Sequence, residues 1–380
     1  MKLFTVADFD SDWYPKNAIS LFQKYSVFEF PENPEEADII WIFSHYIPLE
    51  KILQEEKHEY LKKRVRQTIK RVRKKLGIQT QQVKRRTIKP KKDCLKGKLT
   101  LASFHHLYKP KEEVYLRCIP QINKICDVVH FFSERNILEN KQYFTAPILL
   151  LPYWIDTAQF HPLPLIQKQQ IRQSFHIPHD KMVIGSFQRD TEADLVTPKY
   201  EKGPDLFCDI LNSLDPKRFF VLLAGPRRHY IEQRLKDRAM PFLSLGKIPY
   251  EQMDRLYHCL DYYLVTSRCE GGPQAILEAM ATKTPIYSTR VGISELLSEQ
   301  VIFSTKDDFV KALSQEYPDV LETHYRTIQE FECKKVIKQY EKTLFELNRV
   351  YQQNPKDFFR FTREAQWYNL PKRSILDWLH

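Results

Sequence analysis

The feature that most limits the fold of this chain is a succession of short, continuous apolar runs, each followed by a stretch of helical length. Apolar runs that do not alternate with polar residues are typical of parallel strands that helices bury on both faces. The first series of runs comprises Lys2–Asp8, Val27–Phe30, Asp38–Phe43, Leu99–Phe104, Asp127–Ser133 and Ile148–Tyr153, and the second comprises Met182–Phe187, Phe219–Gly225, Pro241–Gly246, Asp261–Ser267 and Pro285–Thr289. These two series predict an α/β protein in which two doubly wound domains face each other across a cleft.

The length of 380 residues also favours two domains, because a single compact core rarely grows that large. Prolines interrupt the strand–helix rhythm between residues 153 and 164. We therefore expect an N-terminal domain over residues 1–153, a C-terminal domain over 165–330, and helices over 334–380 that pack back across the domains. The seven cysteines form no CxxC pair, and the chain opens without a charged and then apolar leader, which favours reduced thiols and a cytoplasmic location.

The net charge of +11 comes from one segment. Lys62–Lys98 contains 17 Lys and Arg residues against a single acid, and the remainder of the chain has a net charge of −5. Within a predicted basic insert at about residues 57–97, apolar residues recur at helical spacing, namely Leu61, Val65, Ile69, Val72 and Leu76. Such a helix suits an anionic membrane surface, or packs as a solvated insert on the domain. Nucleic acid is the least favoured partner, because aromatic residues for base stacking are almost absent.

Glycine usage places the predicted ligand site in the second series, which holds seven of the nine glycines. The stretch SRCEGGPQAILEAM (Ser267–Met280) combines a strand end, a Gly-Gly turn and a helix start at Pro273. Free amides there would receive a phosphate, while Glu270 and Glu278 would accept hydrogen bonds from hydroxyls on either side of it. Ordinary surface acids on a helix are the alternative. The predicted phosphate-binding residues are Gly271, Gly272, Pro273 and Gln274.

The same stretch resembles the E-x7-E signature of retaining, nucleotide-sugar-dependent glycosyltransferases with the GT-B fold (family 4, glycosyl transferases group 1). Three further segments resemble this family in its order: ILLLPYWIDTAQFHP, VIGSFQRD…YEKGPDLF and FLSLGKIPYEQMDRLYHCLDYYL. Together the four matches cover about residues 148–297. The N-terminal domain matches only in its strand–helix rhythm. The resemblance implies a GT-B fold built from two Rossmann-like domains, with the donor bound by the second.

The resemblance implies that Arg189 and Lys202 neutralise the donor diphosphate. Two fixed cations would stabilise the charge that develops on a leaving diphosphate without a metal. The neighbouring glycine Gly185 is included in the predicted donor site. The loop between Arg189 and Lys202 is longer than is usual in the family, so Lys199 is an alternative to Lys202.

The resemblance assigns Glu270 to donor-sugar hydroxyls near the anomeric carbon and Glu278 to the ribose. His105 and His106 follow the strand Leu99–Phe104, where family members carry a histidine near the sugar and β-phosphate. Histidine can donate a hydrogen bond to a hydroxyl or phosphate oxygen at neutral pH. We favour His105 slightly over His106 as the catalytic histidine.

The first strand is not followed by the glycine-rich turn that the family has. In its place lies an acidic stretch with Asp10 and Trp13, which we assign to the acceptor side together with His106. Asp8, Asp10 and Asp12 resemble the metal-binding acids of the other glycosyltransferase fold, GT-A, but that pair follows a mid-chain strand. We expect no metal site.

The sequence thus predicts a retaining, metal-independent glycosyltransferase of the hexosyltransferase type. It would move a sugar from a nucleotide-diphosphate sugar, its co-substrate and sole small-molecule requirement, to a glycan or lipid-linked acceptor. Its expected location is cytoplasmic, with the basic insert offering a contact to the inner face of a membrane. Two alternatives are a degenerate GT-B module that binds a nucleotide sugar or glycan without turnover, and a nucleic-acid-binding protein acting through the basic insert.

Overall fold

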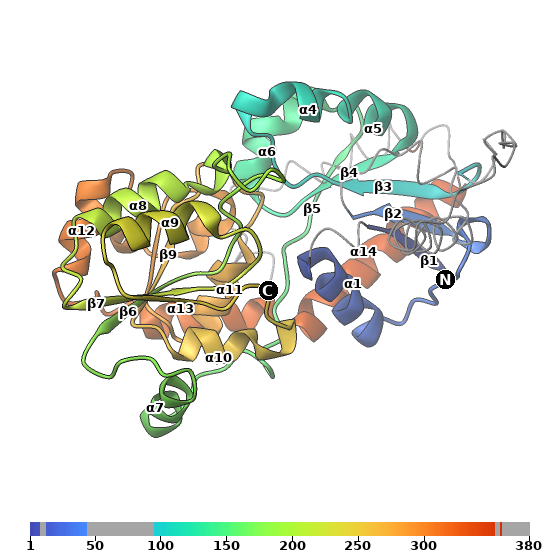
Figure 1. Ribbon diagram of the computed structural model, residues 1–380. Coiled ribbons are helices and arrows are strands. Elements are labelled where there is room, and N and C mark those ends of the chain that lie inside the picture. The colour runs from blue at the N-terminus through green and yellow to red at the C-terminus, as the bar shows by residue number, and fades with distance from the viewer. Residues whose placement is uncertain (8–12, 44–94, 354–357, 359–380) are drawn as a thin grey trace, which may run out of the picture.

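The computed structural model describes residues 1–7, 13–43, 95–353 and 358, with only the backbone for residues 13–15 and 114. Each half of the described chain forms a parallel five-stranded sheet flanked by helices (Figure 1). The N-terminal sheet has the order β1-β2-β3-β4-β5 and the C-terminal sheet the order β10-β9-β6-β7-β8. The predicted fold class, two Rossmann-like parallel-sheet domains, is confirmed.

The N-terminal sheet contains strands that are almost entirely buried, as their continuous apolar sequences predict. Its strands are β1 (Leu3–Val6), β2 (Ile39–Ile42), β3 (Leu99–Ser103), β4 (Val128–Phe131) and β5 (Ile148–Leu150), and its helices are α1 (Trp13–Tyr25), α4 (Glu112–Leu116), α5 (Ile119–Ile125) and α6 (Glu134–Asn140). The predicted strand Val27–Phe30 is reduced to a single bridge, in which Glu29 pairs with Lys2. Val27 is exposed, so this segment lacks the two-sided burial that the apolar run suggested.

In the C-terminal sheet, successive strands are added on one side of β6 and then on its other side. Its strands are β6 (Met182–Ser186), β7 (Phe219–Leu223), β8 (Phe242–Ser244), β9 (Tyr262–Val265) and β10 (Ile286–Ser288), and its helices are α7 (Leu165–Ser174), α8 (Pro204–Asn212), α9 (His229–Asp237), α10 (Met253–His258), α11 (Gln274–Ala281), α12 (Lys306–Leu313) and α13 (Leu321–Ile328). The chain builds β6, β7 and β8 in one direction and then returns to add β9 and β10 on the other side. In a parallel sheet, such a reversal leaves a crevice beyond the carboxyl ends of the two central strands.

The last described helix, α14 (Cys333–Gln353), follows the C-terminal domain in the chain but packs against α1 and β3 of the N-terminal sheet (Figure 1). Tyr340 is the buried centre of this contact. Its ring lies 5.4 Å from that of Trp41, and its hydroxyl contacts the Leu151 and Pro152 carbonyls and the ring of His130. One hydrophobic core consequently runs through both sheets and α14.

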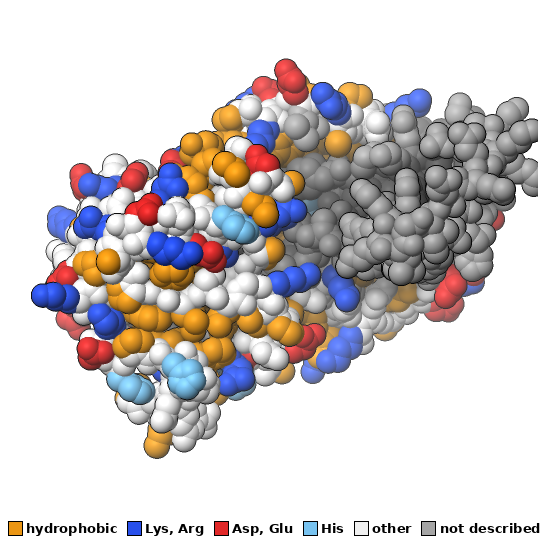
Figure 2. Space-filling view, in the orientation of Figure 1, with side chains coloured by type: hydrophobic (Ala, Val, Ile, Leu, Met, Phe, Trp, Pro, Cys, Tyr) orange, Lys and Arg blue, Asp and Glu red, His pale blue; other side chains and the backbone are white. Residues whose placement is uncertain are grey.

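No helix among the described residues is long and apolar enough to cross a membrane. Almost all of the predicted basic insert, 57–97, lies outside the described residues. The described face of the C-terminal domain shows acidic and basic side chains intermingled rather than segregated (Figure 2).

Candidate active site

Three of the predicted site residues, Arg189, Lys202 and Glu270, lie near the carboxyl ends of β6 and β9, where the C-terminal sheet reverses. The loop after β6 carries Gln188 and Arg189, and the loop after β9 carries Ser267 and Glu270. Because neighbouring parallel strands end at the same edge of the sheet, residues about 80 positions apart in sequence meet there. The site therefore lies in the crevice that the topology creates.

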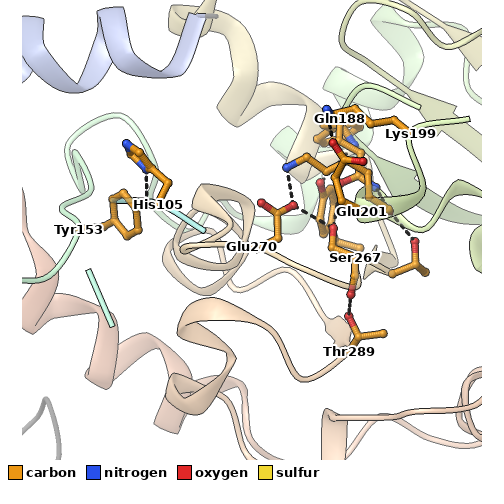
Figure 3. A network of polar contacts seen from close by, with 12 residues as sticks. His105, Tyr153, Gln188, Lys199, Glu201, Ser267, Glu270 and Thr289 are labelled. Atoms are coloured by element: carbon orange, nitrogen blue, oxygen red, sulfur yellow. Dashed lines mark hydrogen bonds and ion pairs between the residues drawn. The ribbon is translucent and has the colours of Figure 1, made fainter. Parts of the chain in front are cut away.

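The centre of the site is a contact between Lys202 and Glu270 (Figure 3). The Lys202 ammonium lies 2.5 Å from a Glu270 carboxylate oxygen, and the same oxygen accepts a hydrogen bond of 2.9 Å from the Ser267 hydroxyl. The Glu270 side chain is only 8% exposed and that of Lys202 only 20%. A nearly buried carboxylate requires a cation, so these two predicted residues depend on each other.

Gly203 explains how Lys202 reaches this position. Its backbone is left-handed, with φ of 60°, and a Cβ there would lie 1.8 Å from the Thr266 carbonyl oxygen at the end of β9. Only glycine permits both the conformation and the close approach. The following Pro204 starts α8 at its first position, where the missing amide hydrogen costs nothing. The Lys-Gly-Pro sequence thus holds Lys202 against the end of β9.

Lys199, the alternative to Lys202, forms a different contact. Its ammonium contacts Glu201 in the same loop, and its pKa is lowered by burial in spite of that carboxylate. Gln188 donates a 2.9 Å hydrogen bond to the Lys202 carbonyl, which links the loop after β6 to the Lys202 segment. This geometry favours Lys202 as the cation beside Glu270. Arg189 is half-buried in the loop next to Gln188, and its diphosphate role stays a prediction.

The Gly-Gly pair lies where the two domains touch. A Cβ on Gly271 would come within 2.0 Å of the His105 carbonyl oxygen, and one on Gly272 would come within 2.0 Å of the Tyr153 ring. Both contacts are to the N-terminal domain or the segment leaving it. Gln274, the first residue of α11, likewise donates to the Trp154 carbonyl at 3.0 Å. The structure therefore gives these residues an interdomain packing reason, and their phosphate contacts stay a prediction.

Pro273 precedes α11 as its N-cap rather than standing at the first helical position. Gly185 lies within β6, where a Cβ would meet the Leu260 side chain at 2.3 Å. The small residue at 185 is thus explained by packing inside the domain. No ligand contact is needed to account for it.

Glu278 is placed differently from the expectation that it shares a ligand with Glu270. Its carboxyl is 1% exposed and accepts a 2.7 Å hydrogen bond from the Tyr257 hydroxyl inside the domain. Burial raises its pKa to about 7, although hydrogen bonds from Tyr257 and Tyr250 act in the opposite direction. The hydrogen-bond partners of the Glu278 carboxyl are thus tyrosines inside the domain rather than Lys202. Its ribose role stays a prediction.

His105 and His106 approach from the N-terminal domain. His105 contacts the Phe43 carbonyl at 2.8 Å through Nε2 and the Tyr153 hydroxyl at 3.0 Å through Nδ1, so both ring nitrogens are engaged. The pKa of His106 is far below its usual value because of burial and because the positive charges of Lys202 and His105 lie near it. His106 is therefore neutral at pH 7. Asp10 and the Trp13 side chain lie outside the described residues.

Comparisons with known proteins bear on the family resemblance and on the fold. Residues 194–322 match the family model described as Glycosyl transferases group 1. The chain is 14% identical to Anabaena Alr3699/HepE, whose crystal structure contains UDP and glucose, with a TM-score of 0.64 over 90% of this chain and 99% of that one. A glycosyltransferase from Rickettsia africae ESF-5 superposes with a TM-score of 0.59 at 15% identity, covering 91% and 98% of the two chains. The chain has the GT-B glycosyltransferase fold.

Curated relatives of this GT-B chain are biosynthetic glycosyltransferases. Lipopolysaccharide core biosynthesis mannosyltransferase LpsB of Rhizobium meliloti (strain 1021) is 29% identical over 187 residues, which is 45% of this chain and 50% of the relative. The putative teichuronic acid biosynthesis glycosyltransferase TuaC of Bacillus subtilis (strain 168) is 23% identical over 242 residues, 60% of this chain and 56% of the relative. The matched regions span about half the length of these relatives. The resemblance to group 1 glycosyltransferases noted in the sequence is confirmed.

Four residues of the candidate site were not identified from the sequence. Ser267 and Gln188 support the Lys202–Glu270 pair, and Lys111 and Glu201 form a neighbouring ion pair. Ser267 stands three positions before Glu270 and Glu201 directly before Lys202, so both were within the quoted motifs. No sequence motif linked Lys111 to the Lys202 segment, because Lys111 belongs to the other domain.

Proposed function

We propose that this chain is a retaining, metal-independent glycosyltransferase of family 4. It transfers a sugar from a nucleotide-diphosphate sugar to a glycan or lipid-linked acceptor. The observation that carries the proposal is the nearly buried Lys202–Glu270 pair at the crevice between β6 and β9. Support for the donor class comes from HepE, whose structures contain UDP, glucose or UDP-glucose. Support for the acceptor class comes from LpsB and TuaC, which are named for lipopolysaccharide core and teichuronic acid biosynthesis.

The chemistry follows from the charges at the crevice. Cleavage of a sugar–phosphate bond places negative charge on the leaving diphosphate, and Lys202 with Arg189 would stabilise that charge. When the diphosphate engages Lys202, the Glu270 carboxylate becomes available to accept hydrogen bonds from sugar hydroxyls. A histidine of the opposite domain, His105 or alternatively His106, would donate a hydrogen bond to a hydroxyl or phosphate oxygen.

The proposed location is cytoplasmic. We propose that the basic insert, almost all of which lies outside the described residues, contacts an anionic membrane surface close to a lipid-linked acceptor. Flotation of the full chain and of a chain lacking residues 57–97 with anionic vesicles tests this contact. Equal flotation of the two proteins would contradict it.

The test of the transferase proposal is turnover with nucleotide-diphosphate sugars, measured as release of the nucleoside diphosphate in the presence of glycan and lipid-linked acceptors. Glu270→Gln, Lys202→Met and Arg189→Met should each lower kcat/KM by about a hundredfold or more while the protein stays folded. Glu251→Gln and Lys236→Met, at exposed positions of the same domain, are the matched controls. Wild-type activity in all three site variants would overturn the proposal. Tight nucleotide-sugar binding without transfer by the wild type would favour the degenerate binding module.

A further inference from the structure

An ion-pair cluster joins the N-terminal domain to the Lys202 segment. Lys111 ends the short helical turn Lys109–Lys111 after β3, and its ammonium contacts Glu201 at 2.9 Å and also Glu192. The other oxygen of Glu201 contacts Lys199 (Figure 3). Glu201 therefore lies between one lysine from each domain.

The Glu201 carboxylate is the most buried member of this cluster, with a side chain only 3% exposed. Burial by itself would raise its pKa, but the charge of Lys199 and the hydrogen bonds from both lysines outweigh burial and lower the pKa to about 2. A buried carboxylate that stays ionised depends on its cations, and loss of one of them leaves an uncompensated charge. Separation of the domains would remove Lys111 and leave Glu201 with Lys199 alone.

The backbone of Glu201 connects this cluster to Glu270. The Glu201 carbonyl accepts hydrogen bonds from the amides of Arg268 at 2.9 Å and Cys269 at 3.3 Å, the two residues before Glu270. The residue after Glu201 is Lys202, which contacts Glu270 through its side chain. A displacement of Glu201 would therefore move Lys202 relative to the loop that carries Glu270.

The second partner of Lys111 comes from the extra length of the loop between Arg189 and Lys202. Glu192 starts a turn in this loop, which closes through a hydrogen bond of 2.9 Å from its amide to the Thr197 carbonyl and through a bridge between Thr191 and Pro198. The longer loop thus brings a further carboxylate to the domain interface. This accounts for the loop without making Lys199 the diphosphate ligand.

We infer that Glu201 is a positioning residue for the proposed reaction, and that Lys111 is its partner from the N-terminal domain. With the domains closed, Lys111 and Lys199 hold the Glu201 side chain in place. The Glu201 backbone in turn fixes the position of Lys202 relative to the loop that carries Glu270. With the domains apart, Glu201 loses its contact with Lys111, and the position of Lys202 relative to Glu270 becomes less well fixed. Closure of the domains would therefore also order the residues of the proposed diphosphate site. This inference rests on the proposed function for its kinetic consequence, but the contact itself can be tested without turnover.

The first experiment measures hydrogen exchange of the backbone amides in residues 105–111 and 199–203 for the full chain without ligand. Lys111→Met should raise exchange in both segments, and 0.5 M salt should do the same for the wild type. Lys109→Met is the matched control, because Lys109 is 66% exposed and pairs with Glu112 of its own domain. Unchanged exchange in Lys111→Met would overturn the inference, whether or not the protein is a transferase.

The second experiment is a double-mutant cycle with Lys111→Met and Glu201→Gln, read as kcat and KM for the donor sugar. Each single variant should raise the donor KM at least about fivefold, and the double variant should be little worse than the poorer single one, because both remove the same contact. Additive losses would overturn the coupling. Should Glu201→Gln fail to fold, Glu192→Gln replaces it, since the Glu192 side chain is 30% exposed, against 3% for Glu201, and also contacts Lys111. Absence of transfer by the wild type with every donor would contradict the proposed function and leave the exchange result to decide the contact.

Discussion

Glu278 shows how strongly one side chain can depend on its surroundings. The residue is part of the motif that identifies the fold family, yet its carboxyl is enclosed by tyrosines inside the C-terminal domain, and burial raises its pKa to about 7. Glu270, eight positions earlier, lies at the crevice and contacts a lysine. The same residue type therefore occupies two opposite electrostatic environments within one loop and helix.

The raised pKa of Glu278 predicts a pH dependence of stability. Because the folded state binds the proton more tightly than the unfolded state, this group contributes most below about pH 4.5, and its contribution falls as the pH rises to about 7. Between pH 5 and pH 8 the free energy of unfolding should fall by about 1–3 kcal/mol more in the wild type than in Glu278→Gln. Urea unfolding at both pH values checks this, with Glu251→Gln as the control. Parallel behaviour of wild type and Glu278→Gln would contradict it.

The lowered pKa of Glu201 predicts the opposite dependence. Its stabilisation is present at neutral pH, above its unfolded value, and is lost as the pH falls from about 4.5 towards 2. The wild type should therefore lose more stability than Glu201→Gln in acid, as measured by thermal unfolding between pH 6 and pH 3. A wild type and variant that weaken equally over this range would show that Glu201 is not held in its ionised form.

At the level of elements, two contacts join segments that are far apart in the sequence. The loop between β9 and α11 packs against the N-terminal domain, and α14 packs against the N-terminal sheet. Both contacts rely on residues with little tolerance for change. Gly271 approaches the His105 backbone too closely for any Cβ, and the Tyr340 hydroxyl contacts two carbonyls and a histidine. A single small substitution can therefore test the contribution of each contact to stability.

Gly271→Ala should destabilise the protein by at least about 2 kcal/mol, because the added Cβ meets backbone of the other domain, which cannot rotate away. Gly246→Ala is the control. Its φ of 62° is left-handed, unlike that of Gly271, but the space around it is open, so the cost of Gly246→Ala should be only about 1 kcal/mol. Urea unfolding measures both. Equal costs would indicate that the close approach at Gly271 is relieved elsewhere.

Tyr340→Phe keeps the ring between Trp41 and Trp154 but removes the hydroxyl. The buried carbonyls and His130 then lose a partner, which should cost about 1–3 kcal/mol of unfolding free energy. Tyr325→Phe, on the half-buried face of α13, serves as the comparison. A cost for Tyr340→Phe no larger than that of Tyr325→Phe would contradict this account of α14.

For the whole molecule, the two sheets share a hydrophobic core with α14, and the site lies where the domains meet. The N-terminal sheet therefore takes part in this shared core as well as in a second core formed within its own domain. The domain contact has two parts of different kind. Gly271 and Gly272 supply close packing, and Lys111 with Glu201 supplies charge. Added salt should therefore weaken the contact between Lys111 and Glu201 but not the packing at Gly271 and Gly272.

The sequence by itself determined the strands, because continuous apolar runs require burial on both faces wherever they fold. It also pointed to Lys202 and Glu270 as candidate site residues, Lys202 through the family resemblance and with Lys199 as its alternative. The run Val27–Phe30 was wrong as a strand, because edge exposure cannot be read from composition. Only the tertiary structure decided that Glu270 meets Lys202, that Glu278 turns inward, and that Lys111 reaches Glu201 from 90 positions away. Apolar periodicity is local, whereas an ion pair between domains exists only after both have folded and docked.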